Sequence, residues 1–117
     1  MKSTKPYLFE ALYKCITDSD LTPLMLARAD ILGVKLPKGF DQDETIVLDL
    51  SYDAVTDLAI NNHFIAFEAI FNDAPFKVHI PMSAVLSIRC KENDIGIDFA
   101  FEPEQDIQET ESESGEG

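Results

Sequence analysis

The chain has 117 residues, enough for one domain with a buried core but too few for two ordinary domains. Its net charge of −13 argues against a partner bound mainly through phosphates, because few cations are present to replace the counterions of a nucleic acid. It has no apolar run of membrane-spanning length and no signal-peptide core, so we expect a soluble, cytoplasmic protein that binds neither nucleic acid nor membrane. Cys15 and Cys90 lie among apolar neighbours and are expected to be buried free thiols.

Acidic residues concentrate at the C-terminal end. From Glu102 onward the chain has seven acidic residues and no Lys or Arg, so this end carries −7 of the total charge of −13 and the first 101 residues carry −6. Its Ser, Glu, Gln and Gly composition, with Ile107 as the sole large apolar residue, predicts disorder. We therefore expect a folded domain over residues 1–103 and a disordered acidic tail over residues 104–117.

The first predicted element is a helix over residues 7–17, which Ser3 or Thr4 can cap and whose first turn suits Pro6. Its polar residues form one narrow stripe at about 100° per residue, so it has more apolar surface than one core needs. Leu8, Leu12, Cys15 and Ile16 are expected to face the core. Phe9 and Tyr13 lie on one flank of the helix, and Tyr7 and Ala11 lie on the other. Either a long sheet surface wraps this helix within one monomer, or the helix contacts a second chain, the interpretation that we favour.

Short strands follow the helix. They are predicted at residues 24–29, 45–50, 58–60, 85–89 and 97–101, with a hairpin over residues 63–81 and a short extended piece at residues 34–36. Residues 38–44 form a loop with one aromatic candidate, Phe40, and residues 51–55 form a turn or a single helical turn. In the second strand Ile46, Leu48 and Leu50 share one side, and Val47 lies on the other. This order predicts a mainly β fold with an N-terminal helix (α+β), in which two small sheets pack as a helix-capped barrel or sandwich.

The hairpin carries the most informative surface. It turns at Asn72-Asp73, ends at Pro81, and has no clearly polar face on its first strand. On one face Ala69 lies between Phe67 and Phe71, with Phe76 and Val78 on the returning strand, and this leaves a notch in which an extended backbone would fit. The alternative is an ordinary core in which Ala69 accommodates a bulky neighbour.

No catalytic cluster is recognisable. His63 and His79 have no carboxylate or cysteine at a metal-binding spacing, and Asp41, Asp43 and Glu44 lack the glycine and the spaced glutamate of a calcium loop. The sequence has no phosphate-binding Gly-rich loop and no nucleophile elbow. We therefore expect no enzyme activity, no metal and no cofactor.

A set of collinear segments resembles the stringent starvation protein B (SspB) family. The segments run from Pro6 to Glu104 and are Pro6-Tyr7-Leu8, Leu21-Thr22-Pro23, Gly33-Val34 with Pro37, Ile46-Val47-Leu48, Ala84-Val85-Leu86 with Ile88, Glu92-Asn93 and Phe101-Glu102-Pro103-Glu104. The final turn, around residues 95–100, is slightly longer here than in the family. The resemblance implies a homodimeric adaptor that binds the ssrA degradation tag of stalled nascent chains and delivers tagged proteins to the ClpXP protease.

The resemblance also implies site residues. The dimer interface would contain Tyr7, Leu8, Ala11 and Leu12 of the helix. The peptide-binding residues would be Phe40, Ile46, Val47, Phe67, Ala69, Phe71 and Val78. Such a groove recognises an extended peptide through backbone hydrogen bonds and small pockets.

The sequence departs from the family at one end. Family members continue to a C-terminal peptide that docks on the zinc-binding domain of ClpX, and the sequence here stops at Gly117 before any such peptide. Tag binding is therefore better supported than delivery. A dimeric β domain that binds a different peptide or protein is the alternative, and RNA binding on a small barrel is disfavoured by the acidic charge.

Overall fold

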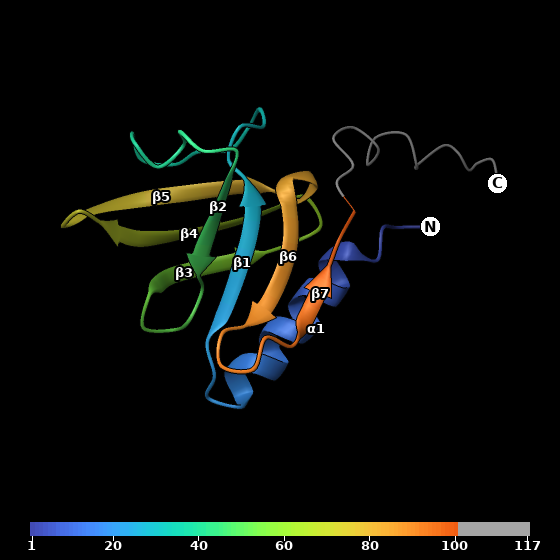
Figure 1. The fold of residues 1–117 in the computed structure, drawn as a ribbon. Helices are drawn as coiled ribbons and strands as arrows, with labels where there is room; N and C mark the ends of the chain where they lie inside the picture. The colour runs from blue at the N-terminus through green and yellow to red at the C-terminus, as the bar shows by residue number, and fades with distance from the viewer. Residues whose placement is uncertain (101–117) are drawn as a thin grey trace.

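The computed structural model describes residues 1–100, and the tail predicted for residues 104–117 lies outside the described residues. Its helices and strands are α1 (Lys5–Asp18), β1 (Pro23–Arg28), β2 (Thr45–Asp49), β3 (Val55–Ile60), β4 (Phe64–Phe71), β5 (Ala74–Pro81), the 3-10 helix η1 (Met82–Ala84), β6 (Val85–Cys90) and β7 (Gly96–Asp98). The strands form two antiparallel sheets, one four-stranded with order β2-β1-β6-β7 and one three-stranded with order β3-β4-β5 (Figure 1). This confirms a mainly β fold with an N-terminal helix.

Helix α1 starts two residues earlier than predicted. Pro6 lies in its first turn. Thr4 is the N-cap residue but its side chain makes no capping bond, and the Lys5 N–H donates instead to Ser3 Oγ at 3.2 Å. The helix lies beside β6 and β7 and packs on the four-stranded sheet (Figure 1). A glycine is not needed to end it, because the Ser19 and Leu21 N–H groups both donate to the Ile16 carbonyl.

The face of α1 that enters the core differs from the prediction. Phe9, Tyr13 and Ile16 are buried, whereas Leu8 and Cys15, predicted to face the core, are exposed. The prediction erred because α1 is apolar over most of its circumference, so periodicity alone could not select the buried side. The expected buried thiol is confirmed for Cys90 and wrong for Cys15, and both cysteines are free.

The inner face of the four-stranded sheet is strongly apolar. Along β1 buried and half-buried residues alternate, and Met25 pairs with Leu48 on one side and Ile88 on the other. All three side chains belong to one core that also contains Phe9 of the helix. Burial of such side chains, each worth about 1.5–3 kcal/mol, is what holds the helix on the sheet.

The hairpin forms at the predicted place. Asn72 and Asp73 both have positive φ, 50° and 70°, as a two-residue turn that matches the twist of the strands requires. Cross-strand pairs place Ile65 opposite Ile80 and Phe67 opposite Val78 on the inner face. The three-stranded sheet thereby closes the second side of the core.

Two strand boundaries differ from the prediction by more than one residue. Strand β3 begins at Val55, not at residue 58, because a bulge with Asp57 at φ 57° interrupts the alternation that would have revealed it. Strand β7 is shorter than predicted, ending at Asp98. Residues 82–84, between β5 and β6, form the 3-10 helix η1.

Candidate functional site

The predicted groove residues of the hairpin share the inner face of the three-stranded sheet. Phe67 pairs with Val78, Ala69 pairs with Phe76, and Phe71 pairs with Ala74. Phe67 and Val78 are 4% and 1% exposed, so both are core residues that support this face from below. Ala69, Phe71 and Phe76 are half-buried and are the members of the face that a ligand can touch.

Phe40 meets this face at the end of the hairpin. Its ring lies edge-on to Phe71 with centroids 5.0 Å apart, and Phe71 meets Phe76 in the same manner at 6.4 Å. Phe40 belongs to the long connection between β1 and β2, so the contact joins a loop to the hairpin. The structure thus brings together Phe40, Phe71 and Phe76 as a row of rings.

Ala69 lies at the side of this row. It pairs with Val55 on β3 as well as with Phe76 on β5. A hollow of about 270 Å³ borders it, lined by Asp53, Ala54, Val55, Thr56, Glu68, Ala69 and Ile70. A larger side chain at position 69 would fill part of this hollow, which a short extended peptide can otherwise occupy.

Ile46 and Val47 lie on opposite faces of β2. Ile46 pairs with Ala27 and packs against the core, while Val47 is 58% exposed on the outer face. Val47 lines a different hollow, of about 340 Å³, together with Leu24 and Leu26. One ligand can therefore contact both residues only by running along the edge of the strand.

That edge of β2 is open in the described residues. Strand β2 is the last strand of its sheet, and bonds from Ala29 N–H to the Glu44 carbonyl and from Leu50 N–H to the Pro23 carbonyl fix its pairing with β1. By alternation, the backbone groups of Thr45, Val47 and Asp49 point away from β1. An extended peptide can pair with such an edge.

The edge of β5 is closed by other means. Pro75 and Pro81 have no N–H, and His79 exchanges two backbone bonds with Lys35, at 2.8 and 3.2 Å. On this strand only Lys77 is left with both an N–H and a carbonyl to pair outward. Of these two edges, that of β2 is the one whose backbone N–H and carbonyl groups can pair with an extended ligand.

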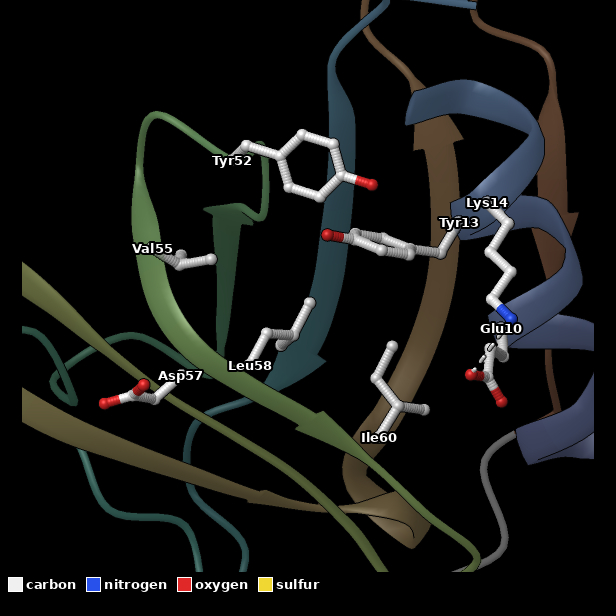
Figure 2. A pocket seen from close by; sticks show the side chains of 8 residues that line it. All are labelled: Glu10, Tyr13, Lys14, Tyr52, Val55, Asp57, Leu58 and Ile60. Carbon is white, nitrogen blue, oxygen red and sulfur yellow. Dashed lines mark ion pairs between the residues drawn. The ribbon is translucent and has the colours of Figure 1, made fainter. Parts of the chain in front are cut away.

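A third hollow, which the sequence did not predict, lies between α1 and β3. It measures about 330 Å³ and is lined by Glu10, Tyr13, Lys14, Tyr52, Val55, Asp57, Leu58 and Ile60. Figure 2 shows Tyr13 from the helix and Tyr52 from the β2–β3 turn pointing toward one another, with Leu58 and Ile60 below them. The two tyrosine rings meet at 84° with centroids 6.5 Å apart.

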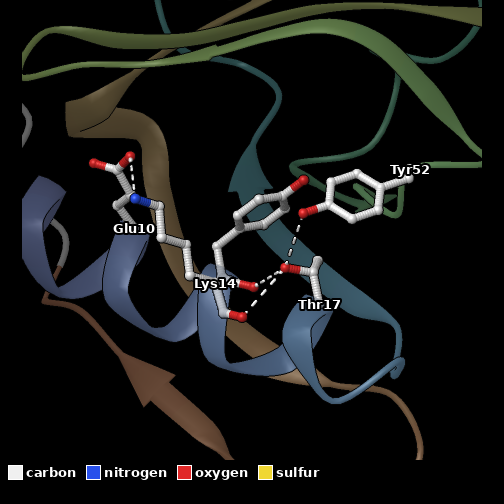
Figure 3. A network of polar contacts seen from close by, with 5 residues as sticks. Glu10, Lys14, Thr17 and Tyr52 are labelled. Carbon is white, nitrogen blue, oxygen red and sulfur yellow. Dashed lines mark hydrogen bonds and ion pairs between the residues drawn. The ribbon is translucent and has the colours of Figure 1, made fainter.

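Polar contacts fix the two tyrosines. Tyr13 Oη donates to the Leu50 carbonyl at 3.3 Å. Tyr52 Oη donates to Thr17 Oγ1 at 3.4 Å (Figure 3). Thr17 Oγ1 in turn lies 3.0 Å from the Tyr13 carbonyl. Burial, followed by the neighbouring Tyr52, raises the pKa of Tyr13, which keeps its phenol protonated as a donor. These groups brace the helix against the β2–β3 turn.

The outward face of α1 carries the predicted interface residues. Tyr7 is 54% exposed and Leu8 is 44% exposed, Ala11 is exposed, and Leu12 is half-buried against the core. With Cys15, which is also exposed, Tyr7, Leu8 and Ala11 form a continuous stripe, called the helix stripe below. In the single chain this apolar stripe is exposed to solvent.

Residues 1–100 contain no group of three or more His, Cys, Asp or Glu side chains placed to hold a metal ion. His63 is exposed in the β3–β4 turn, and His79 lies on the outer face of β5. The acidic loop residues Asp41, Asp43 and Glu44 are exposed, and Glu44 forms an ion pair with Arg28 at 3.4 Å. In the described part of the chain, no helix is long and apolar enough to cross a membrane.

The fold and its exposed surfaces define a small helix-capped domain of two β sheets, with an apolar helix stripe and a row of aromatic rings beside an open strand edge. The chain belongs to the SspB family, described as stringent starvation protein B, whose profile matches residues 3–117. It is 40% identical over 101 residues to a stringent starvation protein B homolog of Haemophilus influenzae, with 86% of this chain covered. The match covers 66% of that relative's length.

Proposed function

We propose that the protein is an adaptor that binds ssrA-type degradation tags as extended peptides and delivers tagged proteins to the ClpXP protease. The single observation that carries the proposal is the row formed by Phe40, Phe71 and Phe76, which runs beside the small residue Ala69. Aromatic walls around a small floor residue bind a narrow chain, and the nearby edge of β2 supplies backbone donors and acceptors. Membership of the SspB family supports the adaptor role.

In this proposal the seven predicted residues have different roles. Ala69, Phe71 and Phe40 contact the peptide, whereas Phe67 and Val78 hold their face in place from the core. Ile46 and Val47 contribute through the strand edge that they share. Affinity at one groove is modest, because ordering a flexible tag offsets much of the contact energy.

We also propose that two chains pair through the helix stripe and place two grooves in one assembly. Exposed Tyr7, Leu8 and Ala11 supply apolar surface whose burial favours association, and Leu12 supports the stripe at its edge. A dimer that is bound to the protease would hold cargo in two grooves, which raises the effective concentration of tagged cargo at the protease. ClpX is the proposed partner for delivery.

The decisive experiment is a fluorescence-anisotropy titration of the protein into a labelled ssrA peptide, with Ala69→Gln and Ala66→Gln as a matched pair. Both alanines lie on β4, but Ala66 pairs with Ala59 and His79 on the outer face. We expect saturable binding for the wild type and for Ala66→Gln, and loss of binding for Ala69→Gln with an unchanged thermal transition.

Each result has a defined meaning. No saturation by the wild type at concentrations on the order of tens of micromolar would contradict tag binding and leave a β domain for another peptide or protein. Equal affinity in both glutamine variants would contradict the groove assignment. Delivery is tested separately, by the rate at which ClpXP degrades an ssrA-tagged reporter with and without the protein.

A further inference from the structure

The connection between β1 and β2 is long and is fixed at only a few points. At its base Arg28 pairs with Asp30 at 2.8 Å and with Glu44 at 3.4 Å, so one side chain holds both ends of the loop together. The Ala29 N–H also donates to the Glu44 carbonyl at 2.8 Å. These contacts anchor the base but do not reach the part of the loop that carries Phe40.

The polar contacts of the far part of the loop converge on one residue of the hairpin, His79. The Lys35 N–H donates to the His79 carbonyl at 2.8 Å, the His79 N–H donates to the Lys35 carbonyl at 3.2 Å, and His79 Nδ1 lies 3.1 Å from the Gly33 carbonyl. Within residues 1–100, every hydrogen bond that leaves residues 31–40 ends on His79. His79 is thus the polar link between this loop and the three-stranded sheet.

The imidazole is itself oriented by its surroundings. Its ring stacks on Phe64 with centroids 4.7 Å apart and planes tilted by 38°. Because the Gly33 carbonyl can only accept, Nδ1 must carry the proton and donate. Gly33 has φ 95° and its Cα approaches Pro81 so closely that a Cβ would lie 3.1 Å from Pro81 Cγ, which lets the loop lie flat on the end of β5.

Phe40 depends on this link for its position. Its N–H closes a turn on the Pro37 carbonyl at 3.0 Å, directly after Gly39 at φ 95°, and its ring then reaches Phe71. Between Lys35 and Phe40 no other hydrogen bond ties this stretch to the sheets within the described residues. Besides this polar link, the stretch is held by apolar packing, of Val34 and Leu36 on the core and of the Phe40 ring on Phe71.

We propose that the His79 side chain is a positioning residue for peptide recognition, which locks the loop at Gly33 and so preforms the Phe40 wall over Phe71. The inference rests on the proposed function, because it assigns His79 a role at the same groove. A wall that is already ordered lowers the entropy cost of binding, so loss of the lock weakens affinity without removing any atom that touches the peptide. His79 faces away from the groove, on the outer side of β5.

Four proteins test the proposal: the wild type, His79→Val, His79→Asn and His63→Val. Valine favours a strand and keeps the backbone bonds to Lys35 but has no donor, whereas the amide of asparagine can replace Nδ1. His63→Val is the matched control, because His63 is an exposed histidine outside the loop contact. His79 is half-buried at the surface, and a thermal transition checks that each variant folds.

The first readout is amide hydrogen exchange at Lys35 and Phe40 without peptide. We expect exchange about fivefold faster in His79→Val, the effect of one net hydrogen bond, with rates near those of the wild type in His79→Asn and His63→Val. Unchanged exchange in His79→Val would overturn the lock. Rescue by asparagine separates a lost donor from general damage to the strand.

The second readout is affinity for the labelled ssrA peptide. We expect about fivefold weaker binding by His79→Val, restored in His79→Asn and unaltered in His63→Val. If the wild type binds and His79→Val binds equally well, the role of His79 in recognition is overturned even where exchange is faster. If the wild type binds no peptide, the proposed function and the role in recognition fail together, and faster exchange in His79→Val would still support the lock on the loop.

Discussion

Phe40 and Phe71 meet edge to face, with ring centroids 5.0 Å apart and planes at 66°, and this contact joins the β1–β2 loop to the end of the hairpin. Phe76 continues the row at 90° to Phe71. Edge-to-face packing of this kind aligns the positive edge of one ring with the negative face of the next. It fixes the orientation of a loop residue that has few polar contacts of its own.

The energy of this contact can be measured by a double-mutant cycle. We expect Phe40→Leu and Phe71→Leu to couple by about 1 kcal/mol in the free energy of unfolding, because leucine keeps apolar area but loses the ring geometry. Denaturant titrations of the two single variants and the double variant give the coupling. Strictly additive effects would mean that the rings are neighbours without a specific interaction.

Association through the helix stripe predicts a charge-sensitive dimer. Ala11→Lys places an ammonium at the centre of the stripe, beside exposed Tyr7 and Leu8, and burying that charge against a second chain is unfavourable. We expect the wild type to sediment as a dimer and Ala11→Lys as a monomer with about the same helix content. Ala59→Lys, an exposed alanine on β3, is the matched control and should remain dimeric.

Gly96 predicts a backbone conflict in the four-stranded sheet. A Cβ there would lie 2.2 Å from the Ile88 carbonyl oxygen and 2.5 Å from Arg89 Cγ, and the backbone oxygen cannot move aside without breaking the β6–β7 pairing. We expect Gly96→Ala to lower the free energy of unfolding by about 2 kcal/mol.

The control for Gly96 is Gly39→Ala. Gly39 has no atom within 4 Å of the added Cβ and is strained only by its φ of 95°. We expect a loss of about 1 kcal/mol there. Equal losses at the two glycines, measured by urea denaturation, would show that packing around Gly96 relaxes freely.

The sequence predicted the hairpin well because its signals are local. Asn72-Asp73 suits a turn with positive φ, and alternation along β4 correctly paired Ala69 with Phe67 and Phe71 on one face. The opposite sides of Ile46 and Val47 on β2 followed from the same alternation. Such features depend on neighbouring residues in the chain, so one sequence suffices to find them.

Other features depended on contacts between distant segments and were not predictable. The side of α1 that enters the core is selected by the sheet beneath Phe9 and Tyr13, and the hollow at Tyr52 exists only because the β2–β3 turn reaches the helix. The start of β3 was obscured by the bulge at Asp57. The lock at His79 pairs a loop with a strand, and no spacing in the sequence marks it.

Glu92 predicts a specific pH dependence of stability. Its carboxylate accepts bonds from the Thr22 N–H at 2.9 Å and from Thr22 Oγ1 at 2.7 Å, which ties the β6–β7 turn to the entrance of β1. The bonds from the Thr22 backbone and side chain lower the pKa of Glu92 from 4.5 to about 2. Because the folded pKa lies below the unfolded one, the contribution to stability is present above about pH 4.5 and is lost as the pH falls toward 2.

Glu92→Gln removes this titration. We expect the variant to be less stable than the wild type at pH 7, and the difference to shrink between pH 4.5 and 2, because the wild type then loses the charged acceptor. Urea denaturation at a series of pH values measures the difference. Asp43→Asn, in the exposed loop before β2, controls for the loss of one negative charge. A difference that stays constant from pH 7 to pH 2 would show that the Thr22 bonds do not depend on the charge of Glu92.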